Sequence, residues 1–179
     1  MLNRQKNKMS IKKTAVLAMQ VALSIILGKY LALPVGDVMR FSFENLPIIF
    51  TGIVFGPISA AMVGLCADLV GCILVGFTPI PLVAIGAVAI GVISGLLPRL
   101  LSRFFNSRAA SVIITVAAAH IIGSVIIKTF GLSSFYDMPF HLLMLWRLLN
   151  YLIVGAAESV LLIIILKNQG IQNQIDKMR

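Results

Sequence analysis

Long apolar runs, separated by short polar or basic segments, make up most of the chain. An α-helix rises about 1.5 Å per residue, so about 20 apolar residues cross the hydrocarbon core of a bilayer, which is roughly 30 Å thick. The first run, Thr14 to Leu33, has this length. It is too long for the apolar part of a signal peptide, and it ends at Leu33-Pro34 without a small-residue cleavage site. We therefore expect a retained membrane helix over residues 14–33, after a basic cytoplasmic segment over residues 1–12.

The stretch from Leu46 to Pro98 has 53 residues and a single formal charge, Asp68. The first helix ends outside the cell, whereas the basic residues after this stretch belong inside, so the number of crossings between them is odd. One crossing cannot use all these residues, which leaves three, and at least one must be short or tilted. The helix breakers Gly56-Pro57 and Gly76 to Pro81 predict where these spans end. We expect helices over residues 46–56, 58–75 and 80–98.

Two further apolar runs complete the pattern. They predict a fifth helix over residues 109–128 and a sixth over residues 141–166, with an outer connection from Lys128 to Pro139. Residues 167–179 then form a cytoplasmic tail. The sequence therefore predicts an all-α integral membrane protein, in which residues 1–179 form one membrane domain with six transmembrane helices.

The distribution of Lys and Arg predicts the direction of the helices. Eleven of these residues lie before the first helix, between the fourth and fifth helices, or at the C-terminus. Three lie on or near the opposite side. Cytoplasmic loops of membrane proteins carry an excess of Lys and Arg, so we expect both termini in the cytoplasm. The three outer residues are Lys29, Arg40 and Lys128, and Arg147 lies within the sixth helix.

Composition supports the same class. Hydrophobic residues are 59% of the chain, charged residues are 12%, and the mean hydropathy is +1.02. A soluble domain carries about 25% charged residues, so a water-soluble globule and a disordered chain are both excluded. The topology accounts for the net charge of +9, and we expect no nucleic-acid partner. Cys66 and Cys72 lie on different helix faces without paired histidines, which indicates apolar core residues rather than a metal site.

Small residues recur at helical spacing in three of the predicted helices. Such stripes let helix backbones approach closely inside a bilayer. The stripes in the third and fourth helices are typical of packing within this chain. The stripe in the first helix equally suits contact with another membrane protein. The stripes are Ala15, Ala18 and Ala22; Ala60, Gly64, Ala67 and Gly71; and Gly91 and Gly95.

Ionisable residues inside apolar helices are costly, so they indicate structural hydrogen bonds or a ligand site. We interpret Asp68 and Glu158 as structural, and leave His120 open between a structural hydrogen bond and a ligand contact. Arg147 lies near the outer end of the sixth helix, and a guanidinium suits recognition of a carboxylate. Together with Arg40, it predicts an outward pocket for a planar, anionic small molecule. The neighbours that favour this pocket are Phe41, Phe43, Trp146, Asn150 and Tyr151.

Several motifs are absent from the sequence. It contains no G-x-x-x-x-G-K-[ST], no H-E-x-x-H and no G-x-S-x-G, so we expect neither ATP hydrolysis by this chain nor an enzyme, and no cofactor. Two inverted halves, which many secondary transporters have, are not evident either. A small membrane binder without an energy source needs partners.

Several segments carry a resemblance to the substrate-binding S components of energy-coupling factor (ECF) vitamin transporters, specifically the folate type. The resemblance extends from about Lys13 to Leu166. The segments are Arg40-Phe-Ser-Phe-Glu-Asn-Leu-Pro-Ile-Ile, Phe55-Gly56-Pro57, Gly64-Leu-Cys-Ala-Asp68-Leu-Val-Gly71, the Pro-rich Phe77 to Pro81, and Leu145-Trp-Arg147-Leu-Leu-Asn150-Tyr with Glu158.

This resemblance implies a six-helix, multi-pass subunit in a bacterial plasma membrane that captures folate, or a related pterin vitamin, outside the cell. It implies two kinds of partner: a membrane coupling subunit, which docks on Ala15, Ala18 and Ala22, and two cytoplasmic ATPases. His120 stands where the family pattern suggests an amide. Another vitamin such as riboflavin or thiamine stays open as the substrate, and the rival class is a small membrane enzyme or scaffold. The expected substrate-binding residues are Arg40, Phe41, Phe43, Phe77, Pro79, His120, Trp146, Arg147, Asn150 and Tyr151.

Overall fold

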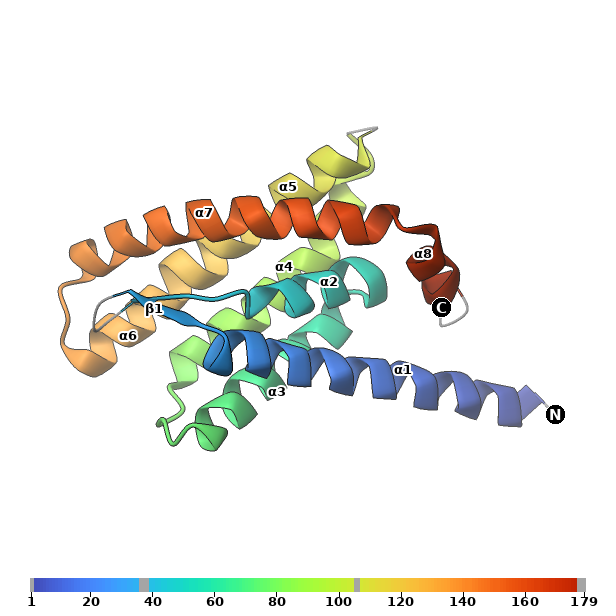
Figure 1. Cartoon of the computed structure of the whole chain (residues 1–179), viewed down its shortest axis with the longest axis horizontal. Helices are drawn as coiled ribbons and strands as arrows, with labels where there is room; N and C mark the ends of the chain where they lie inside the picture. Colours follow the sequence, from blue (N-terminus) through green and yellow to red (C-terminus); the bar gives the residue numbers. More distant parts are fainter. Residues whose placement is uncertain (1, 36–38, 105–106, 177–179) are drawn as a thin grey trace.

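The structure is a computed structural model that describes residues 2–35, 39–104 and 107–176, and the side chains of residues 11–33, 41–104 and 107–176. It is a bundle of helices with one short antiparallel hairpin (Figure 1). The elements, in which η denotes a π-helix, are α1 (Leu2–Ile25), η1 (Ile26–Tyr30), β1 (Leu33–Val35), β2 (Met39–Phe41), α2 (Asn45–Phe55), α3 (Pro57–Leu74), α4 (Pro81–Leu101), α5 (Arg108–Ala119), η2 (His120–Ile127), α6 (Lys128–Tyr136), α7 (Phe140–Lys167) and α8 (Gln169–Asp176).

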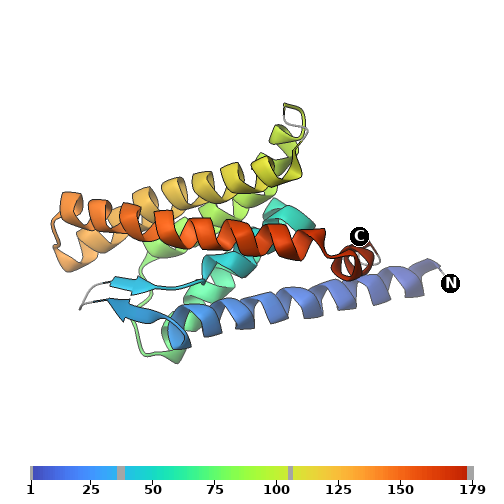
Figure 2. The same cartoon turned by 45° about the horizontal axis from the view of Figure 1, so that its top comes forward.

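The long helices run side by side, and both termini lie at one end of the bundle (Figure 1). The hairpin lies toward the other end, where its β1 and β2 pair from Leu33 with Phe41 to Val35 with Met39 (Figure 2). α4 and α7 end, and α5 begins, at the end of the bundle that holds the termini (Figure 1), and Arg99, Arg108 and Lys167 belong to these helix ends. From the positive-inside rule we expect that end to be cytoplasmic and the hairpin to face the outside of the cell.

Within the described residues, five helical segments are long and apolar enough to cross a membrane. They are Ile11–Tyr30, Pro57–Leu74, Pro81–Leu101, Arg108–Tyr136 and Phe140–Lys167. The expected count of six is not confirmed, because α2 has only 11 residues. A helix of that length reaches about 16 Å, roughly half of the hydrocarbon core.

Two local features set the bounds of the short helix α2. Before it, the chain is still in the hairpin at Phe41 and turns into the helix only at Asn45. After it, Gly56 adopts a φ of 93°, in the region that favours glycine, and Pro57 begins α3. The sequence prediction of a helix over 46–56 is thus close in its bounds.

The fifth helix extends beyond the expected 109–128. Helical structure continues through η2 and α6 as far as Tyr136, and only three residues connect it to α7. The predicted outer connection over 128–139 is therefore mostly helix. The physical reason is that Lys128, which marks a boundary in the sequence, is buried and paired inside the bundle.

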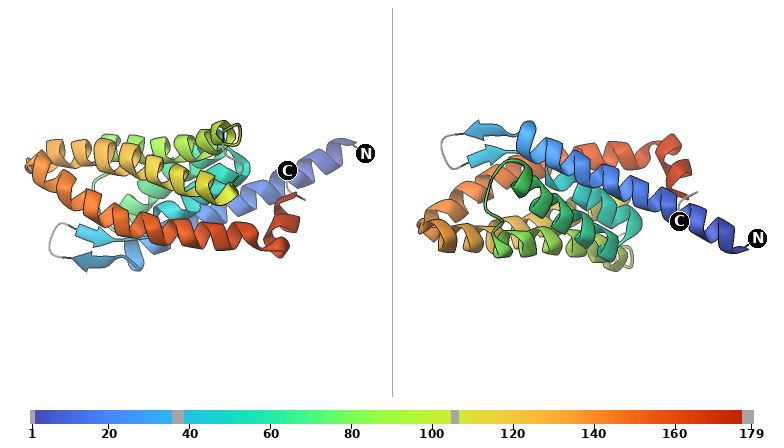
Figure 3. Two further views of the ribbon diagram at one scale, coloured as in Figure 1. Left: turned by 90° about the horizontal axis from the view of Figure 1, so that it is seen from above. Right: turned by 90° about the horizontal axis from the view of Figure 1, so that it is seen from below.

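α4 is the central helix of the bundle, in contact with α2, α3, α5, η2 and α6. Figure 3 shows α7 and the α5–η2–α6 helix on one face of the molecule, and α1 with α3 on the opposite face. The small residues of α3 and α4 allow their close approach: a Cβ on Gly91 would lie 2.5 Å from the Ala60 carbonyl oxygen, and one on Gly64 would lie 2.6 Å from that of Ala87. The predicted internal packing of these stripes is confirmed.

The small-residue stripe of α1 has a different environment. Ala15, Ala18 and Ala22 are all exposed on the outside of the bundle. The face that they form is open to lipid or to another membrane protein.

Candidate functional site

The polar residues of the interior gather where α2 begins. In Figures 1 and 2 this helix starts well inside the bundle, and an extended segment leads to it from the hairpin. Asn45, its first residue, is fully buried. A half-length helix that begins inside a bundle brings its polar N-terminal backbone and the preceding side chains to membrane depth. The candidate functional site surrounds the N-terminus of α2.

A buried ion pair lies immediately before α2. The Nζ of Lys128 donates to Oε1 of Glu44 at 2.8 Å, and only 4% of the Lys128 side chain and 24% of the Glu44 side chain are exposed. The Ser24 hydroxyl donates to the backbone oxygen of Glu44 at 2.6 Å. Burial alone would raise the pKa of Glu44, but the ammonium groups of Lys128 and Lys29 outweigh it and lower this pKa to about 2.

The lowered pKa of Glu44 predicts acid sensitivity. A group whose pKa is lower in the folded state stabilises the fold above its usual pKa, and this contribution is lost as pH falls through the folded value. For Glu44 the window runs from 4.5 down to about 2. We expect the wild type to lose about 3 kcal/mol of stability across it beyond any loss of Glu44→Gln. Thermal unfolding in detergent from pH 6 to pH 2 measures the difference, and parallel curves for the two proteins would contradict the prediction.

A chain of hydrogen bonds runs from α2 through η2 to α7. The Nδ2 of Asn45 donates to Oγ of Ser124 at 3.5 Å, and Ser124 lies 3.5 Å from Nδ1 of His120. On its other side, Nε2 of His120 is 2.6 Å from Oε2 of Glu158. With its proton on Nε2, His120 donates to the carboxylate and accepts from the serine. Glu158, interpreted from sequence as structural, is thus the partner that orients His120.

Aromatic and guanidinium groups lie beside this chain on the hairpin side. The ring of Tyr151 stacks on His120, with centroids 4.7 Å apart and an interplanar angle of 24°. Arg147, one turn nearer the outer end of α7, donates from Nη2 to the Tyr151 hydroxyl at 3.4 Å, and its guanidinium carbon is 5.5 Å from the centre of that ring. The positive charge of Arg147 also acts on Glu44 and helps to lower its pKa.

Several buried polar atoms of this region have no hydrogen-bond partner among the described residues. A buried polar atom without a partner is costly, and more so in a bilayer, where water is scarce. A ligand with complementary donors and acceptors would satisfy these atoms. They are Oδ1 of Asn45, Oδ2 of Asp68, Oε1 of Glu158 and Nε of Arg147.

The base of the site is closely packed. Beside the ion pair lies a cavity of only about 10 Å³, roughly the size of one water molecule. Asp68 and Lys29 line it, and the Nζ of Lys29 is 4.0 Å from Sγ of Cys72. The charged side chains of Lys29, Glu44, Asp68 and Lys128 are therefore surrounded mainly by protein atoms rather than by water. Within the described ranges, no three His, Cys, Asp or Glu side chains are placed to hold a metal ion.

The structure brings together some of the residues expected from sequence. Tyr151 contacts both His120 and Arg147, and Asn150 is buried on the same side of α7. Phe41 and Phe43 are half-buried in the segment that leads to α2. These residues come from the hairpin segment, η2 and α7.

Other expected residues lie elsewhere. Trp146 is 51% exposed, on the outer surface of α7, and Phe77 is 44% exposed on the connection between α3 and α4. Pro79 is exposed and borders an apolar groove with residues of α3 and α4. The backbone of Arg40 pairs with Pro34 in the hairpin, but its side chain lies outside the described part of the chain.

Sequence reasoning missed the ion pair and the polar residues beside it. Glu44 and Asn45 lay within the quoted motif but had no assigned role, and Lys128 was placed in an outer connection. Glu44 and Lys128 are 84 positions apart, so no local spacing links them. The signal available in the sequence was a lysine directly after a long apolar run, which is compatible with a helix end and with a buried cation alike.

Comparisons with known proteins agree with this arrangement. A family model described as the substrate-specific component of ECF transporters matches residues 12–166. The crystal structure of FolT bound with folic acid has a TM-score of 0.68 and 20% identity, covering 84% of this chain and 90% of that one. The S-component for biotin from an ECF-type ABC transporter has a TM-score of 0.68 and 19% identity, covering 93% and 96%. At these identities the likeness is one of fold. No curated protein sequence matches the chain.

Proposed function

We propose that this chain, which belongs to the family of ECF transporter substrate-specific components, captures folate or a related pterin vitamin outside the cell for uptake. As a member of that family it is an integral membrane, substrate-binding subunit of a transporter and not an enzyme. The observation that carries the substrate proposal is the cluster around the start of α2, in which a cation, stacked rings and unpartnered acceptors meet.

The chemistry of a pterin vitamin matches these groups. Folate combines a flat heterocycle, which has an edge of N–H donors, with a tail that ends in carboxylates. Arg147 would bind a carboxylate, since a guanidinium offers a planar fork of donors. Tyr151, already stacked on His120, would present an aromatic face to a flat ring. The free carboxylate oxygen of Asp68 and the amide oxygen of Asn45 would accept from the ring edge.

Calorimetry of the purified chain in detergent tests this substrate. We expect saturable one-to-one binding of folate, and no binding of riboflavin or thiamine. Biotin belongs in the panel because a biotin S-component shares the fold with the same TM-score. Biotin has a carboxylate but no aromatic ring, so binding of biotin in place of folate would overturn the role given to Tyr151. If none of these four vitamins produces a heat of binding, the proposal that this chain captures a vitamin is wrong.

The exposed alanine stripe of α1 supports a docking role. The chain contains no ATP-binding motif, and its resemblance to the folate-type S components implies a membrane coupling subunit and two cytoplasmic ATPases as partners. Ala15, Ala18 and Ala22 offer a face without long side chains, on which a partner helix can pack at short range. We assign the docking surface for the coupling subunit to this stripe.

A bulky residue in the stripe should separate capture from transport. We expect Ala18→Trp to lower uptake at least tenfold in cells that hold the coupling module, while the isolated chain binds the vitamin with unchanged affinity. Ala117→Trp is the matched control, because Ala117 is an exposed alanine on α5, away from the stripe. Equal loss of uptake in both variants would count against the docking role, and loss of binding in Ala18→Trp would indicate a folding defect.

A further inference from the structure

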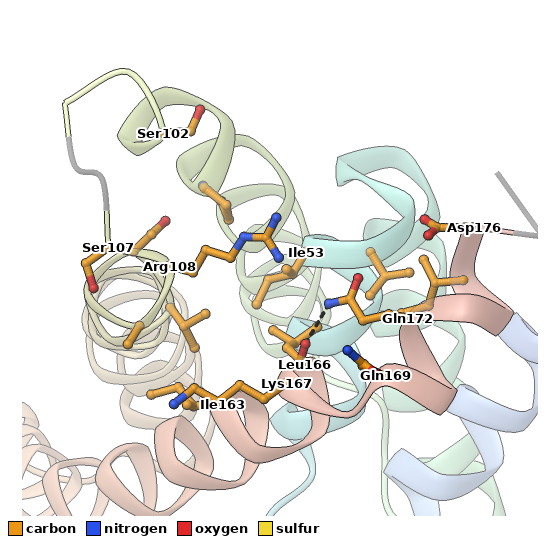
Figure 4. Close-up of a pocket in the computed structure, with 16 residues that line it drawn as sticks. Ile53, Ser102, Ser107, Arg108, Ile163, Leu166, Lys167, Gln169, Gln172 and Asp176 are labelled. Carbon is orange, nitrogen blue, oxygen red and sulfur yellow. Dashed lines mark hydrogen bonds between the residues drawn. The ribbon is translucent and has the colours of Figure 1, made fainter.

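A large pocket opens at the cytoplasmic end of the bundle, remote from the cluster at the start of α2 (Figure 4). Its volume is about 760 Å³, within the range of small-molecule sites. Residues of α2, α4, α5, α7 and α8 line it. The proposed capture of a vitamin from outside the cell does not use this pocket.

One part of the lining is cationic and polar. Arg108 begins α5, Lys167 ends α7, and both side chains are exposed and border the pocket. Ser107 caps α5, where its Oγ accepts from the backbone N–H of Ala110 at 3.4 Å. Figure 4 shows Arg108 extended between the helices and Asp176 at the far side of the pocket. The Arg108 side is therefore positively charged, and the partial positive charge of the α5 N-terminus adds to it.

Much of the remaining lining is apolar. Ile53, Val112 and Ile163 form a wall between α2, α5 and α7. Gln172 of α8 reaches back to donate from Nε2 to the carbonyl oxygen of Leu166 at 2.6 Å, which ties α8 across the end of α7 (Figure 4). The pocket thus has two cations at its rim on the Arg108 side, an apolar wall behind them and Asp176 at the far side.

We propose that this pocket binds an anionic glycerophospholipid of the inner leaflet, with its phosphodiester at Arg108 and Lys167 and its glycerol and upper acyl carbons against the apolar wall. The position supports a lipid, because the two cations stand at the ends of the candidate membrane spans Arg108–Tyr136 and Phe140–Lys167, on the side that the positive-inside rule assigns to the cytoplasm. Basic pockets between helices on this side of a membrane suit anionic headgroups. A small soluble anion would use the cations but not the wall.

Native mass spectrometry of the delipidated protein in neutral detergent tests this site. The probes are dioleoyl phosphatidylglycerol, dioleoyl phosphatidylcholine and glycerol 3-phosphate. We expect one phosphatidylglycerol per chain, held at least tenfold more tightly than phosphatidylcholine. Because a cation at a membrane surface contributes about fivefold to binding of an anionic lipid, Arg108→Gln with Lys167→Gln should weaken it about thirtyfold.

A matched control separates a built site from general surface charge. Arg103→Gln removes an exposed cation of the same end that does not line the pocket, and it should leave lipid binding unchanged. Equal weakening by Arg103→Gln, or equal retention of both lipids, would overturn the site. Full displacement by glycerol 3-phosphate would assign the pocket to a soluble phosphate instead. If the double variant fails to fold, Ala109→Phe fills the pocket while it keeps both cations, and unchanged lipid binding by that variant would also overturn the proposal.

Discussion

Lys128→Met is expected to lower the stability of the folded protein by about 3 kcal/mol, because it leaves the carboxylate of Glu44 inside the bundle without its hydrogen-bond partner. This loss of stability is at the low end of the range for a broken buried ion pair, for two reasons. A quarter of the Glu44 side chain is exposed, and Lys29 acts on the same carboxylate. Thermal unfolding in detergent at pH 7 should show a melting temperature about 10 °C lower.

Two further variants show whether the lost pair is the cause. Lys12→Met removes an exposed lysine of α1 and should leave the melting temperature unchanged. Glu44→Gln combined with Lys128→Met removes both charges and should recover most of the loss, since a buried pair is worth little more than its neutral replacement. A double variant as unstable as Lys128→Met alone would mean that packing of the lysine stem, rather than its charge, stabilises the fold.

Arg147→Gln is expected to weaken folate binding about a hundredfold. The substitution removes a charged hydrogen-bond donor from a site where the ligand carboxylate has left water, and a loss of this kind is about 2–3 kcal/mol. Arg147→Lys keeps the charge but not the planar fork, so we expect about a tenfold loss. Calorimetry at pH 7 measures both affinities.

The neighbouring tryptophan provides the control for this prediction. Trp146 is half exposed on the outer surface of α7, so Trp146→Phe should leave folate affinity unchanged. An Arg147→Gln variant that binds as tightly as the wild type would remove Arg147 from the site. If Trp146→Phe weakens folate binding as much as Arg147→Gln does, the effect is not specific to the guanidinium, and the prediction for Arg147 is contradicted.

Prediction from sequence succeeded where a property is local or additive along the chain. The helix over 141–166 matches α7, and the breaker Gly56-Pro57 separates α2 from α3. Hydropathy and charge are sums over consecutive residues, so they predict which segments lie in the membrane without information on tertiary contacts. Helix length in the middle of the chain depended instead on tertiary context, which is why α6 continues past Lys128.

The candidate site was predictable only in part. Arg147 and Tyr151 are four positions apart, so helical geometry by itself brings them to one face. His120 was a candidate because a histidine inside an apolar helix is unusual. Its partner Glu158 is 38 positions away, and no rule of spacing selects that carboxylate among the acidic residues of the chain.

The sequence by itself determined that this protein is an all-helical integral membrane protein, because this class follows from the sum of apolar residues along the chain. Only the tertiary structure decided that α2 stops short inside the bundle, that Glu44 pairs with Lys128 and that His120 bonds to Glu158. A charge inside a bilayer is tolerated when a partner lies within about 3 Å. That partner comes from another helix, and its identity follows from how the helices pack.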